Sequence, residues 1–177
     1  MIRNIVIEGP NNVGKSTLVL RLLDCEEFAG WRTEHLTEKS PNTYEFYDAT
    51  LRHCDSIIFD RHCLGETIYP YLFNRTPNLT VNELIRIVKN NSDTLFVILS
   101  ADFDFINNAY DAKGETPDWY FIANERQLFE NAARALTKDC ANVCFHRNEY
   151  GFDTSEDCVE FIRRLFKESY MTNGDNC

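Results

Sequence analysis

The sequence of 177 residues predicts a three-layer α/β domain, in which helices cover both faces of a parallel β-sheet. Short continuous apolar runs alternate with segments of helical periodicity, and such runs are typical of parallel strands buried on both faces. A glycine-rich loop, Gly9–Ser16, lies between the first apolar run and the first helical segment. The 44% hydrophobic content supports one core, and no linker or internal repeat divides the chain, so we expect a single domain over residues 1–177.

Five short segments predict the strands, at residues 4–9, 31–36, 56–59, 94–99 and 142–146, and all but 31–36 are mainly apolar. The run TLFVIL at 94–99 is the clearest, and the run WRTEHL at 31–36 is the weakest. Strands that alternate with helices in this way join through right-handed crossovers. Ligands of such sheets bind at the carboxyl ends of the strands.

Segments of helical periodicity follow the strands, at residues 15–23, 41–54, 60–73, 80–90, 119–136 and 154–170. Asn42 and Glu45 have capping-box spacing in the second segment, and Thr80 and Glu83 have it in the fourth. Pro70 is expected to disturb the third segment. The polar stretch at 108–118 has no period and predicts a loop.

Charge and composition count against several classes of protein. The net charge of −10 disfavours a protein that binds nucleic acid, because its surface repels phosphate polymers. No apolar run is long enough to span a membrane, and the start MIRNIVIEG is too short and too polar for a secretory signal, so we expect a cytoplasmic protein.

The cysteines predict reduced thiols without a disulfide framework. There are seven, an odd number, and no two form a Cys-x-x-Cys pair. Cys140, Cys144 and His146 lie close in sequence, but a zinc site needs a fourth ligand. These cysteines are therefore interpreted as core residues.

The glycine-rich loop matches the pattern Gly-x-x-x-x-Gly-Lys-Ser, known as the Walker A motif or P-loop, in the required place between a strand and a helix. Its glycines let backbone N–H groups and the helix N-terminus face a phosphate. Lys15 is expected to reach the terminal phosphates of ATP, and Ser16 to ligate Mg²⁺. The predicted ATP-binding residues of this segment are Gly9, Asn11, Asn12, Val13, Gly14, Lys15, Ser16 and Thr17.

A second feature is the strand SIIF, which ends in Asp60 and Arg61. An aspartate at the carboxyl end of a strand beside the loop can hold Mg²⁺ or serve as a base. The arginine supplies a forked cation for phosphoryl oxygens. Both are predicted to be catalytic.

The segments IVIEGPNNVGKSTL and FDRHCLGETIYP together resemble the thymidylate kinase and deoxynucleoside kinase group of P-loop kinases, especially the short members encoded by bacteriophages. The resemblance implies a P-loop NTPase fold with strand order 2-3-1-4-5 and ATP above the loop. It further implies a mobile lid over residues 108–118, adenine near Arg147 and Asn148, and a possible homodimer. For a phage protein, the compartment would be the host cytoplasm.

The acceptor is a nucleoside or its monophosphate, and the two require different chemistry. A hydroxyl needs a carboxylate base, for which Glu38 and Asp60 are candidates, whereas a monophosphate needs cations. Glu38 and Lys39 stand after the second strand, where thymidylate kinases carry Arg-Glu-Pro. The candidate cations are Arg61, Lys39, Arg75, Lys113 and Arg126, of which Arg126 could reach the transferring phosphoryl group.

The predicted substrate-binding residues are Glu38, Arg61, Glu66 and Tyr69; Glu66 and Tyr69 lie one helical turn apart. The leading prediction is ATP-dependent phosphorylation of a deoxynucleoside monophosphate, with thymidylate as the first candidate. The alternatives are a deoxynucleoside kinase with a carboxylate base, a kinase of modified bases in DNA, and a non-catalytic nucleotide-binding module. A GTPase is disfavoured, because the sequence has no Asn-Lys-x-Asp-like segment after a strand.

Overall fold

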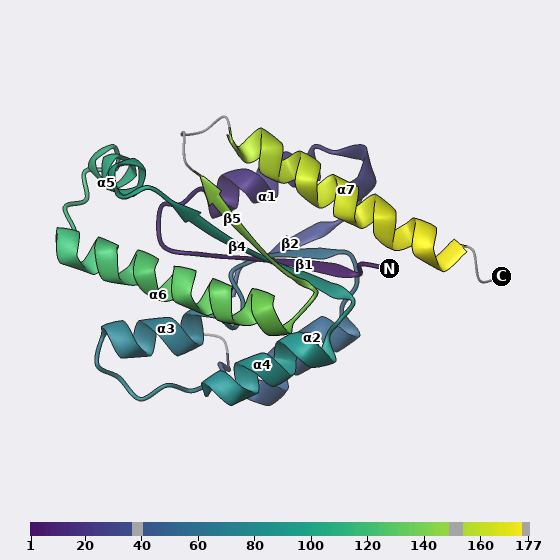
Figure 1. Ribbon diagram of the computed structural model, residues 1–177, viewed down its shortest axis with the longest axis horizontal. Helices are drawn as coiled ribbons and strands as arrows, with labels where there is room; N and C mark the ends of the chain where they lie inside the picture. The colour runs from purple at the N-terminus through teal and green to yellow at the C-terminus, as the bar shows by residue number, and fades with distance from the viewer. Residues whose placement is uncertain (37–40, 149–153, 175–177) are drawn as a thin grey trace.

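The computed structural model describes residues 1–36, 41–148 and 154–174 and contains one five-stranded sheet (Figure 1). The strands are β1 (Asn4–Glu8), β2 (Arg32–Glu34), β3 (Ile57–Asp60), β4 (Thr94–Ala101) and β5 (Val143–Asn148). All the pairs are parallel, and the spatial order is β2-β3-β1-β4-β5. The predicted fold class and strand order are confirmed.

Helices cover both faces of the sheet. They are α1 (Lys15–Leu23), α2 (Tyr44–His53), α3 (Gly65–Leu72), α4 (Val81–Asn90), α5 (Phe103–Asp111), α6 (Trp119–Asp139) and α7 (Thr154–Gly174), with a short 3₁₀ turn at Glu26–Phe28. Figure 1 shows α1 and α7 on one face and α2, α3, α4 and α6 on the other. The described helices include none with the length and apolar content that a membrane-spanning helix needs.

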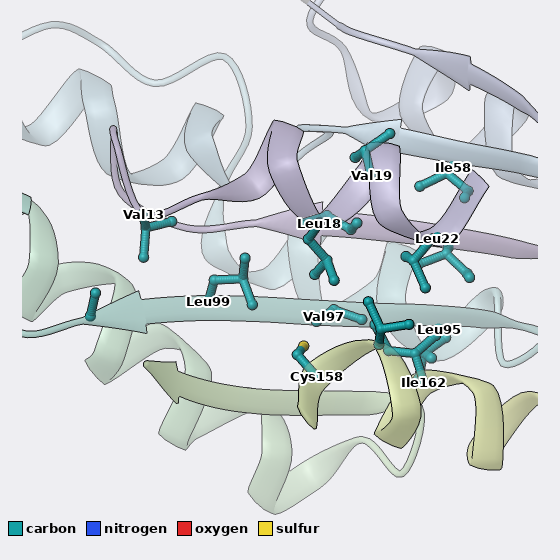
Figure 2. Packing of buried hydrophobic residues seen from close by; sticks show 14 of the residues in the cluster. Val13, Leu18, Val19, Leu22, Ile58, Leu95, Val97, Leu99, Cys158 and Ile162 are labelled. Carbon is teal, nitrogen blue, oxygen red and sulfur yellow. The ribbon is translucent and has the colours of Figure 1, made fainter. Parts of the chain in front are cut away.

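Two apolar cores lie between these layers. On one face, Leu18 and Leu22 of α1 and Ile162 of α7 pack against Val97 of β4, as Figure 2 shows. The second core joins α2, α3, α4 and α6 to the opposite face of the sheet. Because strands such as β4 are buried along their whole length, they read as continuous apolar runs rather than alternating ones.

The predicted capping box at Thr80 is confirmed. The Thr80 hydroxyl accepts from the Glu83 backbone N–H over 3.2 Å, and the Glu83 carboxylate accepts from the Thr80 N–H over 2.8 Å. The prediction that Asn42 caps α2 is wrong by one residue. Thr43 is the cap, because the Asn42 side chain instead accepts a buried hydrogen bond from the Tyr47 hydroxyl over 2.9 Å.

Two predicted segments differ from the structure. The polar stretch 108–118 is not all loop, because its first four residues belong to α5, which buries Ile106 and Tyr110 one turn apart. The third helix begins at Gly65 rather than at residue 60. Arg61 has a φ of +76°, which is not a helical value, so a turn separates the end of β3 from the start of α3. Of the predicted lid segment, the residues between α5 and α6 lie outside any helix or strand.

Candidate active site

The glycine loop turns sharply between β1 and α1 at the carboxyl edge of the sheet. Gly9 has a φ of +146°, and a Cβ at this position would lie 2.6 Å from the carbonyl oxygen of Leu99. Gly14 is the N-cap of α1, with a φ of +94° and no side-chain cap. The N-terminus of α1 is therefore open to an anion, which is the arrangement that binds phosphate groups.

Lys15 is buried beneath the loop. Its Nζ donates to the carbonyl oxygens of Gly9 over 2.9 Å and of Pro10 over 2.6 Å. Burial, and after it the nearby charge of Arg61, lower the pKa of Lys15 to about 7. The amine is thus held inside the loop, where an anionic ligand would favour its protonated form.

Ser16 and Asp60 meet at the start of α1. The Ser16 hydroxyl donates to Oδ2 of Asp60 over 2.6 Å, and Nδ1 of His35 lies 3.6 Å from the same oxygen. The other oxygen, Oδ1, is buried and has no hydrogen-bond partner within the part of the chain that the structure describes. The two predicted metal ligands are therefore adjacent, and one carboxylate oxygen has its lone pairs free.

Arg61 links the loop to α3. Its guanidinium donates to Oδ1 of Asn11 over 2.6 Å and to the hydroxyl of Tyr69 over 3.3 Å. Both partners in turn donate to Oε1 of Glu125 on α6, Asn11 through Nδ2 over 2.9 Å and Tyr69 over 2.8 Å. The predicted residues Arg61, Asn11 and Tyr69 thus share one network.

Two buried carboxylates of the site were missed by sequence reasoning. Glu125 has no exposed surface, and burial raises its pKa while hydrogen bonds from Tyr69 and Asn11 lower it. Glu8 ends β1, and its Oε1 accepts from the backbone N–H groups of His62 and Leu64, each over 2.9 Å. A charged residue that closes an apolar strand directly before the loop was the available signal for Glu8.

Two pockets of about 520 Å³ each meet at Asn11, His35 and Arg61, which line both. The first, here called the loop pocket, is also lined by Asn12, Gly14, Lys15, Ser16, Thr17, Tyr110 and Lys113. The second, here called the side pocket, is also lined by Glu8, Asn42, His62, Glu66, Tyr69, Phe73, Arg75, Thr76 and Asn78. A ligand in one pocket therefore faces a ligand in the other across Arg61.

The predicted substrate-binding residues Glu66 and Tyr69 line the side pocket, and so does the candidate cation Arg75. In the predicted lid segment, Lys113 lines the loop pocket, and its Nζ donates to Oδ1 of Asn12.

Several other predicted residues of the described chain line neither pocket. Arg126 faces Glu130 on the same helix, with 3.9 Å between Nε and Oε1, and lines neither pocket. Arg147 pairs with Asp102 over 2.7 Å, and Asn148 ends β5. Val13 is buried in the core beside α1. Glu38 and Lys39 fall outside the described residues.

Comparison with known proteins gives matches in structure alone. No protein-family model matches the chain, and neither does any curated protein sequence. Among solved structures, YorR from Bacillus subtilis, in complex with phosphorylated GDP, is similar with a TM-score of 0.74 and 17% identity over 95% of this chain and 98% of that one.

Two named kinases share the fold. Deoxyadenosine kinase from M. mycoides with bound dATP has a TM-score of 0.58 and 17% identity, over 93% of this chain and 99% of that one. Thymidylate kinase from Candida albicans has a TM-score of 0.59 and 14% identity, over 96% of this chain and 92% of that one. With the five-stranded sheet and its loop, these likenesses show that the chain has a P-loop kinase-like fold.

Proposed function

We propose that the protein is a kinase that transfers the terminal phosphoryl group of ATP to a deoxynucleoside monophosphate, with thymidylate as the first candidate. The observation that carries this proposal is that two pockets of similar volume adjoin at the Arg61 guanidinium. Direct phosphoryl transfer needs a donor and an acceptor held in line, with cations on the group that moves.

The loop pocket is the proposed donor site. The N–H groups at the start of α1 would receive the ATP phosphates, and Lys15 would exchange its carbonyl partners at Gly9 and Pro10 for phosphate oxygens. Because its pKa is about 7 without a ligand, the approach of the anionic phosphates would keep the amine protonated. Adenine is expected near Arg147 and Asn148, as the family resemblance implies.

Ser16 and Asp60 fit a magnesium ion. The hydroxyl and the carboxylate are hard oxygen ligands, and Oδ1 of Asp60 is a buried oxygen that accepts no hydrogen bond from the described residues. When bound, Mg²⁺ would neutralise charge on the ATP phosphates.

The side pocket is the proposed acceptor site. Arg61 and Arg75 line it and would bind the acceptor phosphate, while Tyr69 and Phe73 offer aromatic faces to the base. A monophosphate has a second pKa of about 6, so it is mostly a dianion at neutral pH and attacks without a protein base. Glu66 is the proposed polar contact of the substrate.

Closure of the lid would complete the site. Lys113 already contacts the loop at Asn12, so a small movement would bring this cation to the phosphates. Arg126 follows Glu125 on α6 and is proposed to reach the transferring group when the lid closes.

A deoxynucleoside kinase is the second candidate. Oδ1 of Asp60 has no partner within the described chain and could accept the proton of a sugar hydroxyl. If Asp60 instead holds Mg²⁺, Glu38 is the remaining candidate for the base.

The test is transfer of labelled phosphate from ATP in the presence of Mg²⁺ to a panel of deoxynucleosides, their monophosphates and DNA. We expect monophosphates to be converted to diphosphates, and Lys15→Ala to lose at least about a hundredfold in rate. The exposed Lys89→Ala is the matched control and should retain full activity. Transfer only to nucleosides supports the second candidate, transfer only to DNA supports a DNA kinase, and ATP binding without transfer indicates a binding module.

A further inference from the structure

Glu125 of α6 closes a ring of hydrogen bonds with the loop, the end of β3 and α3. Its Oε1 accepts three hydrogen bonds, from the N–H of Asn11 over 3.1 Å, from Nδ2 of Asn11 over 2.9 Å and from the Tyr69 hydroxyl over 2.8 Å. Arg61 completes the ring by donating to Asn11 and Tyr69. Figure 1 shows α6 passing beside α3 on this face of the sheet.

The acceptor-only character of a carboxylate decides the direction of every bond in this ring. Because Nδ2 of Asn11 donates to Glu125, the Asn11 amide must present Oδ1 to Arg61. Because the Tyr69 hydroxyl gives its proton to Glu125, its oxygen lone pair faces Arg61. Burial raises the pKa of Tyr69 far above its ordinary value, so this hydroxyl stays a donor.

We propose that Glu125 is a positioning residue for phosphoryl transfer, which acts through Asn11 and Tyr69 to aim the Arg61 guanidinium at the junction of the two pockets. Arg61 has a φ of +76° and no direct bond to Glu125, so its aim depends on these two intermediaries. The kinetic part of this inference rests on the proposed function, whereas the ordering of Arg61 does not.

Charged and titratable groups surround Glu125 on several elements. Lys15 of α1 and Arg61 after β3 favour its ionised form, and Tyr69 of α3 donates to it. Tyr110 of α5 also lies close, and its own pKa is raised mainly by burial and then by Glu125. The carboxylate is thus placed where its charge acts on both cations of the site.

The test compares Glu125→Gln with Glu27→Gln. Glu27 is a matched control, because its carboxylate also accepts several hydrogen bonds, from Arg163 and Lys167, but lines neither pocket. With ATP and the best acceptor, we expect Glu125→Gln to lower kcat about 10- to 100-fold while KM for ATP stays within about twofold. Glu27→Gln should leave kcat unchanged.

The same change is then made in an Arg61→Ala background. If Glu125 acts through Arg61, Glu125→Gln lowers kcat by less than about twofold in this background, because the side chain that Glu125 positions is gone. Should Glu125→Gln fail to fold, Tyr69→Phe replaces it, since this variant removes one of the two intermediaries.

A ligand-free measurement separates this inference from the proposed function. NMR relaxation at Nε of Arg61 should report a more mobile side chain in Glu125→Gln than in the wild type or in Glu27→Gln. Unchanged order of Arg61, or an equal loss of kcat in both backgrounds, would overturn the inference. If the wild type transfers no phosphate to any acceptor, the proposed function fails and the NMR result alone decides the role of Glu125.

Discussion

The hydroxyl of Ser16 donates to Oδ2 of Asp60 over 2.6 Å, although the two residues lie 44 positions apart. The first turn of α1 thereby meets the end of β3, and these two elements carry the proposed magnesium ligands. Parallel strands that end at one edge of a sheet bring such residues together without any local signal between them.

This pair gives the first prediction. Asp60→Asn should lower the rate of phosphoryl transfer by about 10²–10³-fold, because an amide is a poorer ligand for a hard cation. Ser16→Ala should have a smaller effect in the same direction. Rates measured across a range of Mg²⁺ concentrations check this, and a wild-type rate in Asp60→Asn would contradict it. Asp48→Asn, an ion-paired aspartate on α2, is the control.

Lys15 predicts a dependence of stability on pH. Its folded-state pKa of about 7 lies below the ordinary value of 10.5. Between these two values of pH, the lysine is protonated in the unfolded chain and mostly neutral in the folded protein. This residue's contribution to the free energy of unfolding therefore rises with pH through that window. The slope is at most about 1.4 kcal/mol per pH unit.

The measurement is urea unfolding of the wild type and Lys15→Met, without nucleotide, at about pH 7.5 and about pH 9.5. Other groups titrate in both proteins, so the difference between them isolates Lys15. We expect the wild type to gain stability relative to the variant at the higher pH. A constant difference would show that the lysine is not desolvated in the folded state.

Gly9 predicts a steric requirement at the loop. Gly9→Ala places a methyl group 2.6 Å from the Leu99 carbonyl oxygen, at a φ of +146°, and should cost about 3 kcal/mol or more of unfolding free energy. Gly30→Ala is the matched variant, since Gly30 also has a positive φ, +84°, but among the described residues no heavy atom beyond its chain neighbours lies within 4 Å of its Cβ position. It should cost only about 1–2 kcal/mol. Thermal unfolding compares the two, and equal costs would argue against the close contact.

Thr80 predicts a loss of stability without a loss of activity. Thr80→Ala removes the side chain that accepts from the Glu83 N–H, and should lower the free energy of unfolding by about 1 kcal/mol. Thr80→Ser keeps the hydroxyl and should retain most of the stability that Thr80→Ala loses. Denaturant unfolding measures both, and neither variant should change the rate of phosphoryl transfer, because Thr80 lines neither pocket.

The parts of the fold that follow from local patterns were predictable. Continuous apolar runs identified β1, β3, β4 and β5, and the Thr80 capping box marked the start of α4. Where a tertiary contact overrides local preference, the prediction failed. The buried bond from Tyr47 to Asn42 moved the cap of α2 to Thr43.

The sequence by itself determined the loop, its lysine and serine, and the strand that ends in Asp60 and Arg61, because glycine spacing and apolar periodicity are local properties. Only the tertiary structure decided that the Glu125 carboxylate accepts hydrogen bonds from Asn11 of the loop, 114 positions away. A buried carboxylate is defined by the donors that the fold brings to it, and those donors come from elements that no sequence pattern pairs.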